Sequence, residues 1–291
     1  MKLRTVSALQ FAEIVDMGGI PVRQPLPVNK IEMVDPFLLL HHHTGIIEPG
    51  SRSQESGVGP HPHREFSPVT IIFKGDVHHR DSRGNSQVVK AGGVQWMDAG
   101  MGLIHSERPS KEFAERGGEQ EIIQIWVNTP HKFKMNQPNY QALQFEDIPN
   151  IEIENELGSI QVIAGNYQNK TGIAKTKSDL IILRGDFKAG AEHTFIIPEQ
   201  YNLLLYVVDG SIEIEKYATV PELNMVVFKN DGDTVNIKTN QSTRFIVLAG
   251  IPLNEHVESY GPFVMSTQTE IMQALRDYQM GKMGMLIEEF D

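Results

Sequence analysis

Two short motifs in the first half of the chain have the residue types and the spacing of a metal site. The first is HPH, in which His61 and His63 stand one residue apart just before an apolar run that predicts a strand. Residues at i and i+2 of a strand point to the same face, with Cβ atoms roughly 6 to 7 Å apart, so both imidazoles can reach one ion. Paired histidines also occur on exposed strand edges, so this pair alone leaves a structural interpretation open.

The second motif, HSE, supplies another imidazole and a carboxylate. His105 and Glu107 have the same spacing and follow a glycine-rich turn at Gly100 and Gly102. Antiparallel strands within one barrel could bring the two motifs side by side. Three histidines and one carboxylate on a six-coordinate divalent ion would leave positions for water, dioxygen or a chelating substrate. A structural zinc site more often closes as a tetrahedron.

Five further histidines fall in two clusters. His41, His42 and His43 follow an apolar strand, and strand alternation could turn the first and third toward a site. A role as outer hydrogen-bond donors or acid-base groups therefore stays open beside a structural one. For His78 and His79 we expect a role at a strand edge.

The elements that must position these residues are short β-strands. Runs such as VTIIF, EIIQIWVN, LIILRGDF and FIVLAG alternate with turns rich in Gly, Asn and Asp, which favours a sandwich or a barrel. Gln124 and Trp126 stand at i and i+2 of one run, so they share a strand face and could line a cavity. Trp126 taken alone is expected to pack in the core.

The chain also contains a weak internal repeat. VTIIFKGDVHHRD and LLLYVVDGSIEIEK share an apolar strand, a glycine turn at Gly75 or Gly210, and an alternating strand. The offsets that lead from Gly75 to His61, His63 and His105 lead from Gly210 to Ile196, Pro198 and Asn240. We therefore expect two copies of one β-fold, with metal ligands in the first copy only.

The composition of one stretch predicts the domain boundary, and a capping motif predicts one helix. The acidic stretch at residues 139–159 separates the halves, so we expect a metal-binding domain at 1–145 and a second domain at 146–291. Thr267 and Glu270 have capping-box spacing, and an apolar stripe follows up to a stop at Gly281. This segment is predicted to be a helix that covers a sheet.

Composition excludes several classes of protein. The 291 residues carry 26 Lys+Arg against 37 Asp+Glu, a net charge of −11, and show no basic patch for direct nucleic-acid binding. With no cysteine, any metal must be held by nitrogen and oxygen. No apolar segment is long enough to span a membrane, and the simplest location is the cytoplasm.

Four stretches together resemble the pirin family. They are HPHREFSPVTIIFKGDVHHRDSRGN, AGGVQWMDAGMGLIHSERPS, IQIWVNTP and GIPLNEHVESYGPFVMST, and they occur in the family's order from about residue 20 to 280. The resemblance implies an all-β bicupin, with two tandem cupin (jelly-roll-type) β-barrels and a C-terminal α-helix. It implies an iron-type metal in the first barrel only, held by His61, His63, His105 and Glu107, with Gln124 in the wall of the substrate pocket.

The resemblance implies two kinds of activity. Some pirins are quercetin 2,3-dioxygenases, so the first hypothesis is a metal-dependent dioxygenase that acts on a flavonol with dioxygen, with Glu107 as ligand and proton acceptor. Fe(II) is the expected metal, while manganese, nickel and copper accept the same ligands. The alternatives are a redox-responsive iron protein that binds a protein partner without turnover, and a degenerate, metal-free binding protein.

One departure from the family bears on the substrate. The family usually reads HPHRGFET, whereas Glu65, Ser67 and Pro68 stand here for the Gly, Glu and Thr. We expect these changes to alter the wall of the cavity.

Overall fold

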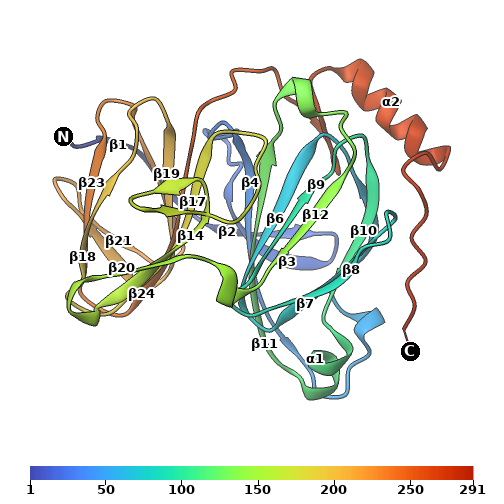
Figure 1. Cartoon of the computed structure of the whole chain (residues 1–291), viewed down its shortest axis with the longest axis horizontal. Coiled ribbons are helices and arrows are strands. Elements are labelled where there is room, and N and C mark those ends of the chain that lie inside the picture. The colour runs from blue at the N-terminus through green and yellow to red at the C-terminus, as the bar shows by residue number, and fades with distance from the viewer. Residues whose placement is uncertain (291) are drawn as a thin grey trace. The chain divides into compact units, whose positions relative to one another are not determined.

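The computed structural model describes residues 1–290 and shows two β-rich units (Figure 1). Unit 1 comprises Met1–Leu38 and Glu146–Leu253, and unit 2 comprises Leu39–Phe145 and Asn254–Asp291. Asp291, the last residue of the expected second domain, lies outside the described residues.

The two units differ from the contiguous domains expected at 1–145 and 146–291, because each takes a segment from the far end of the chain. In unit 1, β1 (Val6–Phe11) pairs antiparallel with β22 (Asn224–Phe228). In unit 2, Ile271 and Ala274 of α2 (Gln268–Gln279) pack in one apolar cluster with Ile104. These pairings join residues that are far apart in sequence, so the local composition around residue 145 could not reveal them.

Unit 2 contains the four-stranded sheet β5-β10-β7-β8, five strands of a second antiparallel sheet in the order β12-β9-β6-β11-β4, and the two-stranded sheet β25-β26. Its elements are β4 (Phe37–Ile47), η1 (Ser53–Glu55), β5 (Val58–His63), β6 (Phe66–Lys74), β7 (Asp76–Asp81), β8 (Ser86–Lys90), β9 (Val94–Asp98), β10 (Leu103–Arg108), α1 (Lys111–Arg116), β11 (Gly118–Asn128), η2 (His131–Phe133), β12 (Asn139–Leu143), η3 (Phe145–Asp147), β25 (Glu258–Tyr260), β26 (Phe263–Met265) and α2.

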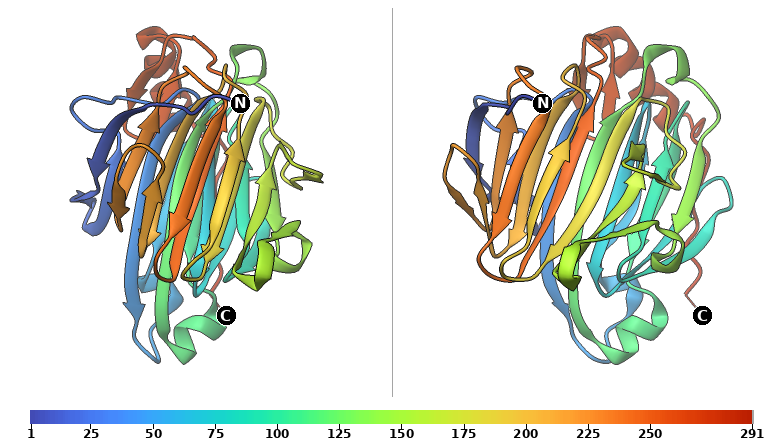
Figure 2. Two further views of the ribbon diagram at one scale, coloured as in Figure 1. Left: turned by 90° about the vertical axis from the view of Figure 1, so that its left-hand side faces the viewer. Right: turned by 60° about the vertical axis from the view of Figure 1, so that its left-hand side comes forward.

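Unit 1 has a seven-stranded sheet, β1-β22-β19-β24-β17-β14-β13, and a four-stranded sheet, β18-β23-β20-β21. Figure 2 shows β17, β19, β22 and β24 of the larger sheet, coloured yellow to orange, running side by side. Aliphatic and aromatic side chains from both sheets form one core cluster. The remaining elements are β2 (Glu13–Met17), β3 (Ile20–Leu26), β13 (Asn150–Glu152), η4 (Glu154–Glu156), β14 (Gly158–Ala164), β15 (Asn166–Tyr167), β16 (Lys170–Thr171), β17 (Leu180–Phe187), β18 (Glu192–Ile196), β19 (Asn202–Asp209), β20 (Ser211–Ile214), β21 (Thr219–Pro221), β23 (Thr234–Thr239) and β24 (Thr243–Gly250).

The repeat expected from the sequence has a direct structural counterpart. Gly75 is the single residue between β6 and β7, and Gly210 is the single residue between β19 and β20. Their φ angles are 78° and 79°, in the left-handed region that glycine enters without steric cost. The two units therefore have a turn between consecutive strands at corresponding glycines.

Both helices begin at a capped residue. The Thr267 side chain accepts a hydrogen bond from the Glu270 amide, as the capping-box spacing predicted, and α2 runs from Gln268 to Gln279. The sequence interpretation missed α1, whose N-cap Ser110 accepts from the Phe113 amide. Among residues 1–290, neither helix has the length and hydropathy needed to cross a membrane.

Candidate metal centre

Three neighbouring strands of unit 2 each carry a polar dyad on one face. Strand β10 lies between β5 and β7 and pairs antiparallel with both. The register places His105 opposite His61 on one side and opposite Asp81 on the other. Strand alternation then brings the two dyads predicted from the sequence to the same face of the sheet.

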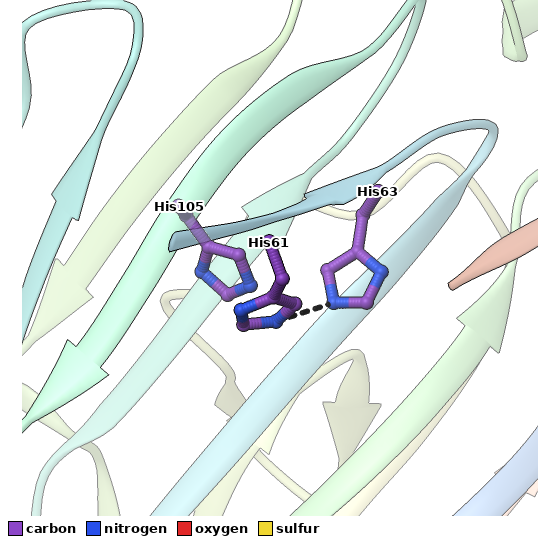
Figure 3. Close-up of side chains that lie close together, drawn as sticks. All are labelled: His61, His63 and His105. Carbon is purple, nitrogen blue, oxygen red and sulfur yellow. Dashed lines mark hydrogen bonds between the residues drawn. The ribbon is translucent and has the colours of Figure 1, made fainter. Parts of the chain in front are cut away.

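The three predicted histidines converge on one point (Figure 3). One ligand nitrogen from each of His61, His63 and His105 lies within 4.8 Å of the other two. The Nε2 atoms of His61 and His63 are 3.1 Å apart, and the ring centroid of His105 lies 4.3 Å from that of His61. This is the one group of potential metal ligands found among residues 1–290.

The hydrogen bonds of the His61 and His63 rings are compatible with the binding of a divalent transition metal. His61 Nδ1 lies 2.8 Å from the Gly59 carbonyl oxygen, and His63 Nδ1 lies 3.0 Å from that of Pro262. Each Nδ1 must therefore carry a proton, so that in the uncharged rings both Nε2 atoms present a lone pair. Two facing lone pairs at 3.1 Å repel one another unless a cation lies between them.

His105 completes this donor set. Its Nε2 is buried and has no hydrogen-bond partner among residues 1–290. Burial lowers the pKa of both His63 and His105 well below the usual range, so both rings are neutral and able to donate a lone pair at physiological pH. An orphaned buried nitrogen beside two facing lone pairs is the pattern that metal binding resolves.

Glu107 lies next to the three histidines but is not part of the group within 4.8 Å. Its Oε1 accepts hydrogen bonds from Thr70 Oγ1, at 2.9 Å, and from Gln95 Nε2. Its Oε2 accepts from Gln124 Nε2 at 2.9 Å. The structure thus brings the predicted Gln124 to the predicted carboxylate, and it adds Thr70 and Gln95, which the sequence did not reveal.

The sequence motifs did not lead us to predict the third dyad, His79 and Asp81 on β7. We expected His79 at a strand edge, but this prediction was wrong: the side chain is fully buried and stacks on Tyr140, with ring centroids 3.9 Å apart. His79 Nε2 lies 3.0 Å from Asp81 Oδ2. The i, i+2 spacing that singled out the other dyads is present here too and could have identified this one.

Hydrogen bonds hold the Asp81 carboxylate as an anion. Burial by itself would raise its pKa, but hydrogen bonds from His79, from Asn85 and from the Arg83 amide lower the pKa below its usual value. Burial, together with the Glu107 and Asp81 carboxylates, raises the pKa of Tyr140, so its hydroxyl keeps its proton and donates to Gln95 Oε1 at 3.2 Å.

The three departures from the family pattern do not share one surface. Glu65 lies 3.9 Å from Lys134 Nζ in a buried ion pair, and Ser67 Oγ donates to Asp98 Oδ1 at 2.8 Å. Alternation along β6 puts Pro68 on the face of Thr70, which contacts Glu107. The expected change in the cavity wall therefore concerns Pro68 more directly than the other two.

The other histidine cluster and the tryptophan lie in different surroundings. His42 Nε2 lies 3.2 Å from Glu121 Oε1, and burial lowers the pKa of His41 to about 4. Trp126 is half-buried and meets His63 edge to face, with centroids 5.4 Å apart. Trp126 therefore lies at the margin of the histidine group rather than in a core away from it.

Two family models match the chain. One, described as Pirin, matches residues 19–127, and the other, described as Pirin C-terminal cupin domain, matches residues 182–284. Together with the all-β architecture, they define a bicupin, a protein of two cupin domains with a C-terminal helix. More narrowly, the chain belongs to the pirin family, as the motifs of the sequence predicted.

Individual relatives agree with this assignment. A pirin-like protein of Solanum lycopersicum is 37% identical over 269 residues, which are 91% of this chain and 88% of the relative. The crystal structure of a quercetin 2,3-dioxygenase from Acinetobacter baumannii is 36% identical, with a TM-score of 0.92 over 98% of this chain and 100% of that chain. The bacterial pirin YhhW of Escherichia coli in complex with nickel(II) shares the fold at 18% identity, with a TM-score of 0.67 over 84% of this chain and 99% of that chain.

Proposed function

We propose that the chain is a metal-dependent dioxygenase of the quercetin 2,3-dioxygenase type, with a flavonol and dioxygen as substrates. The observation that carries the proposal is the convergence of three imidazoles beside a carboxylate. The similarity to the Acinetobacter baumannii enzyme supports the choice of reaction. His61 is partly exposed, unlike His63 and His105, so a ligand has access from its side.

In this proposal His61, His63 and His105 hold one divalent metal, with Fe(II) first and Mn, Ni or Cu as alternatives. When bound, the metal would supply Lewis acidity for an enolisable hydroxyl and an electron pathway to dioxygen. Three imidazoles would leave coordination positions open for a carboxylate and for substrate on a divalent ion that prefers six ligands.

Glu107 takes two roles in the proposal. It completes the ligand set, and it accepts the proton of the flavonol hydroxyl. Both oxygens already accept hydrogen bonds, from Thr70 and Gln95 on Oε1 and from Gln124 on Oε2. These donors fix the direction of the carboxylate. Oε2 accepts one hydrogen bond, from Gln124, and is the oxygen proposed to take the substrate proton.

The test is a turnover assay on metal-loaded protein. Loss of the quercetin absorbance is followed together with dioxygen uptake, for wild type, the double variant His61→Ala/His63→Ala and Glu107→Gln. We expect wild type to bind about one equivalent of metal, as a catalytic site does, and both variants to lose turnover by at least about 100-fold. The matched control is His78→Ala, whose side chain faces Ser86 on the outer side of β7.

The outcomes separate the proposed enzyme from its alternatives. Full metal occupancy without turnover by any of the four metals would refute the dioxygenase and favour the metal-binding interaction protein. Wild type that binds no more metal than the double histidine variant would refute both.

A further inference from the structure

The dyad on β7 is buried behind the candidate metal centre and is not part of it. His79 is fully buried, and Asp81 is 4% exposed. A buried carboxylate and imidazole need partners, and the partner of this pair is the third predicted ligand: His79 Nδ1 lies 3.4 Å from His105 Nδ1.

With both imidazoles uncharged, the hydrogen bonds of this chain of three residues allow one arrangement of protons. Asp81 Oδ1 accepts from the amides of Arg83 and Asn85, at 2.8 and 3.1 Å, and Oδ2 accepts from Asn85 Nδ2 at 2.7 Å. Such a carboxylate can only accept from His79 Nε2, so the neutral His79 ring presents a bare Nδ1. That nitrogen in turn can only accept a proton from His105 Nδ1.

We propose that Asp81 and His79 are a positioning pair that selects the tautomer of His105 and aims its bare Nε2 at the metal. The other two ligands are oriented by backbone carbonyls, at Gly59 and Pro262. His105 differs because its acceptor is an imidazole backed by a carboxylate, which makes it a more basic ligand. This inference rests on the metal site of the proposed function but not on its dioxygenase activity.

The surroundings of the His79 ring support this role. The ring stacks almost parallel on Tyr140, at an interplanar angle of 7°, and Tyr140 is tied through Gln95 to Glu107. The hydrogen bond of 3.4 Å is long for its type, so it contributes little stability on its own. Its effect is to choose between two tautomers, and of these only the one with a bare Nε2 can bind the metal.

Three substitutions separate positioning from packing. His79→Phe keeps an aromatic ring against Tyr140 but removes the acceptor. Asp81→Asn leaves the turn an oxygen for the two amides and turns an amide donor toward His79, which reverses the tautomers of both rings. His79→Gln offers an acceptor oxygen and a donor nitrogen, as the neutral imidazole does, and is the rescue variant. His78→Phe is the matched control on the outer side of the same strand.

Two measurements are made, neither of which requires turnover. Long-range proton–nitrogen NMR of metal-free protein with labelled histidine reads the tautomer of His105. Competition against a chromophoric chelator gives the affinity for Ni(II). We expect the Nδ1–H form of His105 in wild type, His78→Phe and His79→Gln, and loss of that form in His79→Phe and Asp81→Asn. Ni(II) affinity should fall about 10- to 100-fold in the last two and stay within a few-fold in the others.

An unchanged His105 tautomer in His79→Phe, with Ni(II) affinity equal to that of His78→Phe, would overturn the inference. If circular dichroism shows that His79→Phe does not fold, the inference is tested with Asp81→Asn and His79→Gln. Weaker Ni(II) binding by Asp81→Asn but not by His79→Gln supports the inference. Equal Ni(II) affinity of the two variants overturns it. Quercetin turnover can fail without affecting either result.

Discussion

Glu65 occupies a backbone position that the family pattern fills with glycine. Its φ angle is 72°, a left-handed conformation that costs a non-glycine residue about 1 kcal/mol. Taken alone, Glu65→Gly would therefore stabilise unit 2 by that amount. The tertiary environment predicts instead that Glu65→Gly lowers the stability of unit 2.

The reason is Lys134, whose side chain is 2% exposed. Its Nζ lies 3.9 Å from Glu65 Oε2 and donates to Asn128 Oδ1 at 3.1 Å. Burial raises the pKa of Glu65 and lowers that of Lys134, so the pair offsets its desolvation only in part. Removing one member of a buried pair costs about 3 to 5 kcal/mol. With the strain relieved, we expect Glu65→Gly to destabilise unit 2 by about 2 to 4 kcal/mol.

Urea unfolding followed by tryptophan fluorescence measures this change. The chain has two tryptophans, Trp96 and Trp126, and both lie in unit 2, so the signal reports that unit. The double variant Glu65→Gly/Lys134→Met is the control, because it removes the stranded ammonium as well as the strain. We expect it to return to within about 1 kcal/mol of wild type or above it. A single variant Glu65→Gly that is as stable as wild type would refute the reasoning.

Three further outcomes are expected. Gly57→Ala should destabilise unit 2 by more than about 2 kcal/mol in the same assay, because φ is 72° and a Cβ would lie 2.4 Å from the Glu107 carbonyl oxygen; an unchanged midpoint contradicts this. Hydrogen bonds, first from Lys282, lower the pKa of Asp277 to about 2, below its unfolded value, so roughly 1 to 2 kcal/mol of stability is present above pH 4 and is lost as the pH falls toward 2; Asp277→Asn should flatten that acid loss. Thr267→Ala should cost about 1 kcal/mol in thermal unfolding by removing the cap of α2, and no loss would count against the cap.

Much of the candidate site could be predicted because strand alternation is local. The i, i+2 spacing that puts His61 with His63 and His105 with Glu107 on one face is a property of each strand by itself. The cap at Thr267 depends on residues three positions apart, so it could also be predicted from the sequence. Motifs distributed along the chain led to the pirin family, which the family models confirm.

The remaining features depended on which strands became neighbours. The spacing of His79 and Asp81 is the same as in the other two dyads, yet only the pairing of β7 with β10 shows that they lie behind His105. The donors to Glu107 come from three other strands, and of these only Gln124 had a sequence signal, whereas Thr70 and Gln95 had none.

The sequence by itself determined the kinds of elements, the family and the three histidines, because these follow from residue types and short-range periodicity. Only the tertiary structure decided that the ends of the chain exchange between units, that Glu65 is held by Lys134 and that His79 supports a ligand. Each of these depends on contacts between residues distant in sequence. Strand register and burial fix such contacts, and a local pattern carries no information about either.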